Sequence, residues 1–134
     1  MGRKPGLERQ LRALADTSRL RIVNLLLHKE MCGAEIAMAL GLSQPNISRH
    51  LNYLKHTGLV GSRRRGFRVY YRLKRQDRLV SGLLDLLRIV FGRDPVFLRD
   101  LRRLQKIMPK GNYSSSSAPA TKGNSEGGRK LQAD

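Results

Sequence analysis

The chain has 134 residues, and its 27 lysines and arginines against 10 acidic residues give a formal net charge of +17 at pH 7. This length suits one small domain with a limited core, so a second copy of the chain is a natural source of further burial. The charge favours polyanionic partners, nucleic acid before an acidic membrane, and the single cysteine excludes an intramolecular disulfide and any site that needs two thiolates from one chain.

The N-terminal segment, residues 1–6, is short and basic, and we expect it to be flexible. It lacks the apolar run of a secretory signal, and no later stretch approaches the roughly 18 consecutive apolar residues of a membrane span. We therefore expect a cytoplasmic protein with no membrane partner. Leu7, Leu11 and Leu14 recur at helical spacing, which predicts a helix over residues 7–15 whose apolar stripe needs a partner.

A second helix follows the capping residues Asp16, Thr17 and Ser18. We expect it to run to His28 or Lys29 and to form the centre of the core. Its apolar residues are Leu20, Ile22, Val23, Leu25, Leu26 and Leu27. Residues 30–32 are too few for a helix, so we interpret them as a short extended link.

Residues 33–55 are typical of a helix-turn-helix. One amphipathic helix ends before Gly41, which suits the left-handed conformation of a helix stop, and Ser43 is placed to cap a second helix with Pro45 in its first turn. The junction, residues 41–43, has the length of the tight turn that joins the two helices of this motif.

The second helix of this motif is predicted to bury Ile47, Leu51 and Leu54, and its opposite face is polar. The outer and flanking residues are Gln44, Pro45, Asn46, Ser48, Arg49, His50, Asn52, Tyr53 and Lys55. Amides, hydroxyls and arginine are side chains that recognise base edges in a major groove, although alone this face is equally typical of a solvated helix. We call it the reading helix.

Charge placement supports a nucleic-acid contact. No Asp or Glu occurs between Ile36 and Gln76. The basic residues of this stretch are Arg49, Lys55, Arg63, Arg64, Arg65, Arg68, Arg72, Lys74 and Arg75. The positive charge is therefore concentrated over and just after the reading helix.

A β-hairpin is predicted after Gly58, with strands over residues 59–62 and 67–73. Phe67, Val69, Tyr71 and Leu73 alternate with polar or basic residues, which is typical of a half-buried strand. The predicted tip is Arg63, Arg64, Arg65 and Gly66. Such a tip serves solubility in many proteins, but directly behind a helix-turn-helix it favours a wing that contacts phosphates or the minor groove.

Two helices are predicted next, over residues 77–91 and 95–108. The first has apolar residues on more than one face, which one small domain hardly covers, so a second subunit is expected there. The second begins at the cap Asp94 and Pro95. We interpret its basic residues Arg99, Arg102, Arg103 and Lys106 as a solvated face rather than a DNA contact, and a phosphate-binding role stays open as the alternative. The remaining residues, 109–134, have the Ser, Gly, Pro and Lys composition of a disordered tail.

With these elements in order, the chain resembles the ArsR-type (ArsR/SmtB) winged helix-turn-helix repressors. The matching stretches are ALADTSRLRIVNLLL (13–27), EMCGAEIAMALGLSQPNISRHLNYLKHTGLV (30–60) and RRRGFRVYYRL (63–73). The resemblance covers residues 7 to about 91 and implies a mainly α fold with a small β-hairpin and a homodimer joined through its first and last core helices. With the extra C-terminal helix over residues 95–108, we expect one domain over residues 7–108. It also implies that operator DNA is bound in successive major grooves and released when a ligand is sensed.

The resemblance also implies which residues touch DNA. The expected contacts are Gln44, Asn46, Ser48, Arg49 and His50 in the reading helix and Arg65 and Arg68 in the wing. From the basic tip of the predicted hairpin we add Arg63 and Arg64 to the DNA-binding residues. His50 is equally well placed to pack against the core, and Tyr53 either contacts phosphate or packs against the wing.

The sensor is where this chain departs from the family. The Cys-x-Cys of metal-sensing members here reads Cys32-Gly33-Ala34, and the helix over residues 77–91 contains Asp85 but no histidine for zinc. We therefore expect no metal at the usual positions and no cofactor, with Cys32 more typical of a small buried side chain than of a sensor thiol.

The sequence thus predicts a homodimeric, sequence-specific transcription regulator, a repressor that is released by an unidentified signal such as a small-molecule effector. Two alternatives stay open: a nucleoid or RNA-binding protein that uses charge alone, and a redox or arsenite sensor based on Cys32. No residues recur with catalytic spacing, so we do not expect an enzyme.

Overall fold

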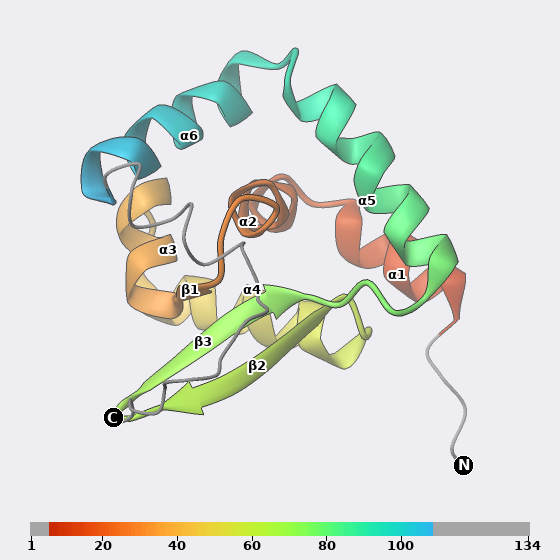
Figure 1. Cartoon of the computed structure of the whole chain (residues 1–134), viewed down its shortest axis with the longest axis horizontal. Coiled ribbons are helices and arrows are strands. Elements are labelled where there is room, and N and C mark those ends of the chain that lie inside the picture. Colours follow the sequence, from red (N-terminus) through yellow and green to blue (C-terminus); the bar gives the residue numbers. More distant parts are fainter. Residues whose placement is uncertain (1–5, 109–134) are drawn as a thin grey trace, which may run out of the picture.

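The computed structural model describes residues 6–108, and the expectations for residues 1–5 and 109–134 lie outside this part of the chain. In Figure 1 the helix α2 lies at the centre, with the other helices around it and a small sheet along one side. The elements in chain order are α1 (Leu7–Leu14), α2 (Thr17–Leu26), β1 (Met31–Cys32), α3 (Gly33–Leu40), α4 (Gln44–His56), β2 (Val60–Arg65), β3 (Arg68–Leu73), α5 (Arg78–Phe91) and α6 (Pro95–Ile107).

The central helix α2 begins where the sequence predicts. The side chain of Asp16 accepts a hydrogen bond from the backbone N–H of Arg19 at 3.0 Å. Ile22, Val23 and Leu25 are completely buried, as expected for the core helix. The helix ends at Leu26, earlier than the predicted end at His28 or Lys29.

The helix-turn-helix is confirmed as α3 and α4. Gly41 adopts the left-handed conformation with φ +69°, which glycine tolerates without strain, and so ends α3. Ser43 Oγ accepts a hydrogen bond from Asn46 N at 3.3 Å and starts α4, the reading helix. Ile47, Leu51 and Leu54 are buried, so the opposite face of α4 is the one that remains outside.

The sheet has three strands rather than the predicted two, in the antiparallel order β1-β3-β2. The third strand is the predicted link, in which Met31 pairs with Tyr71 and Cys32 pairs with Tyr70. Two residues carry no alternation that a sequence pattern can detect. Met31 and Cys32 form a strand only because they pair with β3.

The predicted hairpin tip is wrong in position. Arg63, Arg64 and Arg65 lie within β2, and the loop consists of Gly66, with φ +65°, and Phe67. Because Arg65 pairs directly with Arg68, the strands extend to a two-residue loop. Phe67 is therefore fully exposed at the tip instead of facing the core.

Helix α5 carries two apolar stripes, as the sequence indicates. Asp77 caps it by accepting a hydrogen bond from Leu79 N at 2.8 Å. The inward stripe at i, i+4, i+7 and i+11 is Val80, Leu84, Leu87 and Phe91. The outward side carries Leu79, Leu86, Ile89 and Val90, which are 57%, 58%, 59% and 50% exposed, whereas Leu83 is partly buried against the core. On α1, Leu7 and Leu11 are exposed as well, so both helices have unpartnered apolar faces.

Helix α6 packs against α2 and α3 and so closes the far side of the core. Its cap is confirmed, with Asp94 Oδ1 accepting a hydrogen bond from Val96 N at 2.9 Å. Asn24 Nδ2 donates to Phe97 O at 3.1 Å, and the rings of Phe91 and Phe97 lie 4.4 Å apart between centroids. Within residues 6–108, no helix combines the length and apolar character needed to cross a bilayer.

A buried ion pair, which the sequence analysis missed, joins α2 to α6. Arg21 Nε donates to Asp100 Oδ2 at 2.8 Å and its Nη2 donates to Asp100 Oδ1 at 2.9 Å. The same Nη2 donates to the carbonyl of Leu40 at 3.1 Å, at the end of α3. The guanidinium of Arg21 thus ties three helices together, and Asp100 is completely buried.

Candidate nucleic-acid interface

The outer face of the reading helix α4 presents polar side chains to solvent. Gln44, Ser48 and Arg49 are exposed, and Asn46 is partly exposed. Arg49 Nη2 donates to Asn46 Oδ1 at 2.6 Å, so the two side chains are held together one helical turn apart. Because arginine has five N–H donors in a planar fork, this bond leaves donors for a base edge. The arrangement suits recognition of guanine by Arg49 and of adenine by an amide.

Arg19 of α2 supports the rear of the reading helix. Its Nε donates to Ala13 O at 2.6 Å, and its Nη1 lies 3.3 Å from His50 Nδ1. Its guanidinium carbon lies 4.0 Å from the centroid of the Tyr53 ring, within the range of a cation–π contact. Tyr53 thus stacks on Arg19, a contact that neither of the two alternatives for this side chain included. Nothing in the sequence pattern indicates Arg19, because its partners on α4 are far away along the chain.

His50 lies half-buried between Arg19 and the core. Burial lowers the pKa of His50 below its ordinary value of 6.5, and Arg19 and Arg49 add to this effect, while Asp16 opposes it. His50 thus has a partner within the protein, Arg19, as the packing alternative requires. The contact of His50 with DNA stays a prediction. Burial also lowers the pKa of His28, with a smaller effect of Arg88 in the same direction.

These two pKa shifts predict an acid-sensitive fold. A histidine whose pKa is lower in the folded state binds fewer protons there than in the unfolded chain, so its contribution to stability is present above pH 6.5 and is lost as the pH falls through the folded pKa. We expect the urea midpoint of the protein to drop between about pH 7.5 and 5.5. A variant with His28→Gln and His50→Gln should show a flatter profile over that window, and a parallel profile would contradict the assignment.

The wing, which we define as β2, β3 and their loop, packs beside the reading helix, since α4 contacts β2. Its register places Arg63 opposite Tyr70 and Arg65 opposite Arg68 on one face, while Arg64 lies opposite Val69 on the other. The four predicted wing arginines are therefore divided between two faces rather than gathered at a tip.

Three of these arginines already have partners within the chain. Arg63 Nη2 lies 3.1 Å from Glu30 Oε1, so its charge is partly neutralised. The guanidinium carbon of Arg65 lies 4.9 Å from the centroid of the Tyr70 ring, and Arg68 Nη1 lies 3.7 Å from Cys32 Sγ. The exposed contact between Arg63 and Glu30 is of a weak kind and is easily exchanged for a phosphate.

Cys32 is buried at the start of α3, where its backbone N–H donates to Glu35 Oε1 at 3.0 Å. Over residues 6–108, no three side chains of His, Cys, Asp or Glu come together as a metal site would require. Asp85 of α5 pairs with Arg75 instead of facing further ligands.

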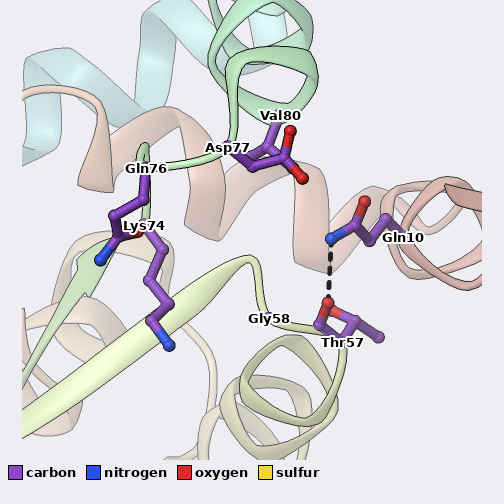
Figure 2. Close-up of a pocket in the computed structure, with 7 residues that line it drawn as sticks. All are labelled: Gln10, Thr57, Gly58, Lys74, Gln76, Asp77 and Val80. Carbon is purple, nitrogen blue, oxygen red and sulfur yellow. Dashed lines mark hydrogen bonds between the residues drawn. The ribbon is translucent and has the colours of Figure 1, made fainter. Parts of the chain in front are cut away.

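A cleft of about 250 Å³ lies between α1, the end of α4, the end of β3 and the start of α5. Figure 2 shows Gln10 pointing across it to Thr57, and Gln10 Nε2 donates to Thr57 O at 3.1 Å. Lys74 and Gln76 point away from this bond (Figure 2). The polar groups of the cleft do not converge on one point, so its main feature is the link between α1 and the reading helix.

Comparison with known proteins gives a consistent picture. The sequence model for the bacterial regulatory proteins of the arsR family matches residues 16–62. The arsenic resistance transcriptional regulator ArsR1 of Pseudomonas putida is 41% identical over 80 residues, which cover 55% of this chain and 62% of that protein. ArsR2 of the same organism is 37% identical over 90 residues, which cover 66% of this chain and 76% of that protein. The match thus spans about three fifths of ArsR1 and three quarters of ArsR2.

Among solved structures, the chain is similar to a homodimeric winged helix-turn-helix DNA-binding domain from Mycobacterium bovis, which is described as a possible ArsR-family transcriptional regulator. The TM-score is 0.57 with 37% sequence identity, and the match covers 64% of this chain and 78% of that one.

Proposed function

This chain belongs to the ArsR family of bacterial regulatory proteins, and we propose that it is a homodimeric transcription regulator, of the repressor type, that binds operator DNA sequence-specifically. In this proposal the reading helix of each copy enters a major groove and the wing lies along the neighbouring backbone or minor groove. Such a regulator acts in the cytoplasm, where bacterial DNA lies.

The observation that carries the proposal is the outer face of α4. The aliphatic residues of this helix, Ile47, Leu51 and Leu54, are buried in the core. The face that remains carries Gln44, Asn46, Ser48 and Arg49 in the N-terminal half of the helix. In helix-turn-helix proteins this half of the second helix reaches the base edges. The same region contains no acidic residue that would repel phosphates.

The exposed apolar faces of α1 and α5 support the homodimer. Four large side chains of α5 and two of α1 are at least 42% exposed, which is costly for a free monomer. A two-fold interface pairs the same patch with itself and so covers both helices at once. The homodimeric state of the similar Mycobacterium bovis domain agrees with this arrangement.

The releasing signal in this proposal is not a metal held by the usual family residues, because Cys32 lacks a second thiolate and Asp85 is paired with Arg75. The candidate partner in this proposal is a small-molecule effector. The cleft that contains Gln10 and Thr57 joins a dimerisation helix to the end of the reading helix, so a change there would alter how the two reading helices are spaced.

Two arginine substitutions test whether the reading helix recognises the DNA sequence while the wing binds phosphates. Arg49→Ala should lower the preference for operator over scrambled DNA by about 1–3 kcal/mol, since it removes a bidentate base contact. Arg65→Ala should weaken binding to both DNAs alike. It should also reduce the slope of log K against log salt by roughly two for a dimer, because each phosphate that is no longer neutralised lowers the slope by about 0.9. Gel-shift titration with DNA from upstream of the protein's own gene measures both effects.

The wild-type protein provides the deciding comparison in this experiment. Equal affinity for operator and scrambled DNA at about 0.15 M salt, with a steep salt dependence, would refute the proposal and favour a nucleoid or RNA-binding protein that uses charge alone.

A further inference from the structure

Helix α6 presents a strongly basic face to solvent. Arg99, Arg102, Arg103 and Lys106 are all exposed, and they recur at helical spacing on one side. The single carboxylate within this helix, Asp100, is completely buried and bonded to Arg21. In the part of the chain that the structure describes, none of the four basic side chains pairs with a carboxylate. Their positive charge is therefore uncompensated on the surface of the protein.

The position of α6 places this face beside the helix-turn-helix. In Figure 1 the end of α6 lies next to α3, and the two helices pack against each other. The bonds of Arg21 to Asp100 and to Leu40 O hold the middle of α6 at the C-terminal end of α3. The basic face is thus fixed in place relative to the turn that precedes the reading helix.

Arg103 lies directly over that turn. A Cβ atom added to Gly41 would lie 2.8 Å from Arg103 Nη1 and 3.7 Å from Cζ, so the guanidinium occupies the space above this glycine. Two residues further on, Ser43 caps α4 and begins the half of the reading helix that faces DNA in the proposed function. The guanidinium of Arg103 therefore lies close to the N-terminal end of α4, the end that enters the groove in the proposed function.

We propose that α6 extends the DNA-binding surface, with Arg103, supported by Arg102 and Lys106, binding backbone phosphates beside the helix-turn-helix turn. The proposal rests on the proposed function and favours the phosphate-binding alternative for this face over a merely solvated one. Such contacts carry no sequence information, but they fix the orientation of the reading helix in the groove and raise affinity through release of counterions.

The test compares Arg103→Ala with a matched charge control, Arg93→Ala, which removes an equal charge from an exposed residue before the start of α6. Affinity for a labelled duplex is measured by fluorescence anisotropy from about 50 to 200 mM salt, the range over which phosphate contacts change binding most visibly. We expect Arg103→Ala to reduce the salt slope by roughly two for a dimer, and Arg93→Ala to leave it close to the wild-type value. Arg103→Lys should keep most of the slope, because lysine retains the charge.

The triple variant Arg102→Ala, Arg103→Ala, Lys106→Ala should reduce the slope further while the preference for operator over scrambled DNA is retained. The proposal would be overturned if Arg103→Ala and the triple variant had the same salt slope as Arg93→Ala. Circular dichroism melts show whether each variant is folded. The slope is measurable on any duplex, so this outcome is distinct from a failure of the proposed function, in which the wild-type protein itself shows no operator preference.

Discussion

Replacement of Asp100 by alanine is expected to lower the free energy of unfolding by about 3–5 kcal/mol, the usual result of removing one partner of a buried ion pair. The side chain of Arg21 is only 14% exposed and that of Asp100 is 0% exposed, so the substitution leaves a guanidinium in the core without its carboxylate. Domains of this kind are stable by about 5–15 kcal/mol, so the decrease is a large fraction of the total. Urea unfolding followed by circular dichroism measures it.

Two further variants show that the effect belongs to the pair. The double substitution Arg21→Met, Asp100→Leu removes both charges together and should retain most of the stability, since buried pairs replaced by apolar residues often cost little. Glu30→Ala removes the exposed partner of Arg63 and should change the free energy of unfolding by less than about 1 kcal/mol. An Asp100→Ala protein as stable as the Glu30→Ala protein would contradict a structural role for the buried pair.

Introduction of charge into the outward side of α5 is expected to separate the dimer and to weaken operator binding by about 10²–10⁴-fold, the usual gain from linking two binding modules. Leu86→Glu together with Val90→Glu places two carboxylates on the face that a second copy would cover, and both positions are at least 50% exposed in the single chain. The fold of each copy should therefore survive while the interface does not. Analytical ultracentrifugation at micromolar concentration and gel-shift titration measure the two effects.

Met38→Glu is the matched control for assembly, because Met38 is a large apolar side chain with 61% exposure that lies on α3 rather than on α1 or α5. It should leave the sedimentation behaviour unchanged. If the α5 double variant also sediments as a dimer, the interface lies elsewhere and the proposed arrangement of the two reading helices is wrong.

Local patterns in the sequence are sufficient to identify most of the fold. Caps such as Asp16, Ser43, Asp77 and Asp94 each start the helix that the sequence predicts there, and Gly41 ends the helix before it. These signals are reliable because a helix end satisfies its backbone groups with residues only three or four positions away. The outer face of α4 follows from the same local periodicity, and its DNA contacts stay predictions.

The tertiary structure alone decided the features that depend on distant partners. The sequence indicates that residues 31–32 are extended, but they form a strand only because they pair with β3. Because Arg65 pairs with Arg68, the hairpin loop lies at Gly66 and Phe67 rather than at the predicted tip, residues 63–66. Arg21 meets Asp100 across 79 positions, and Arg103 lies over the helix-turn-helix turn only because α6 folds back onto α3. The physical reason is range: caps and periodicity act within one or two turns of chain, whereas pairing of charges and strands depends on which elements packing brings together.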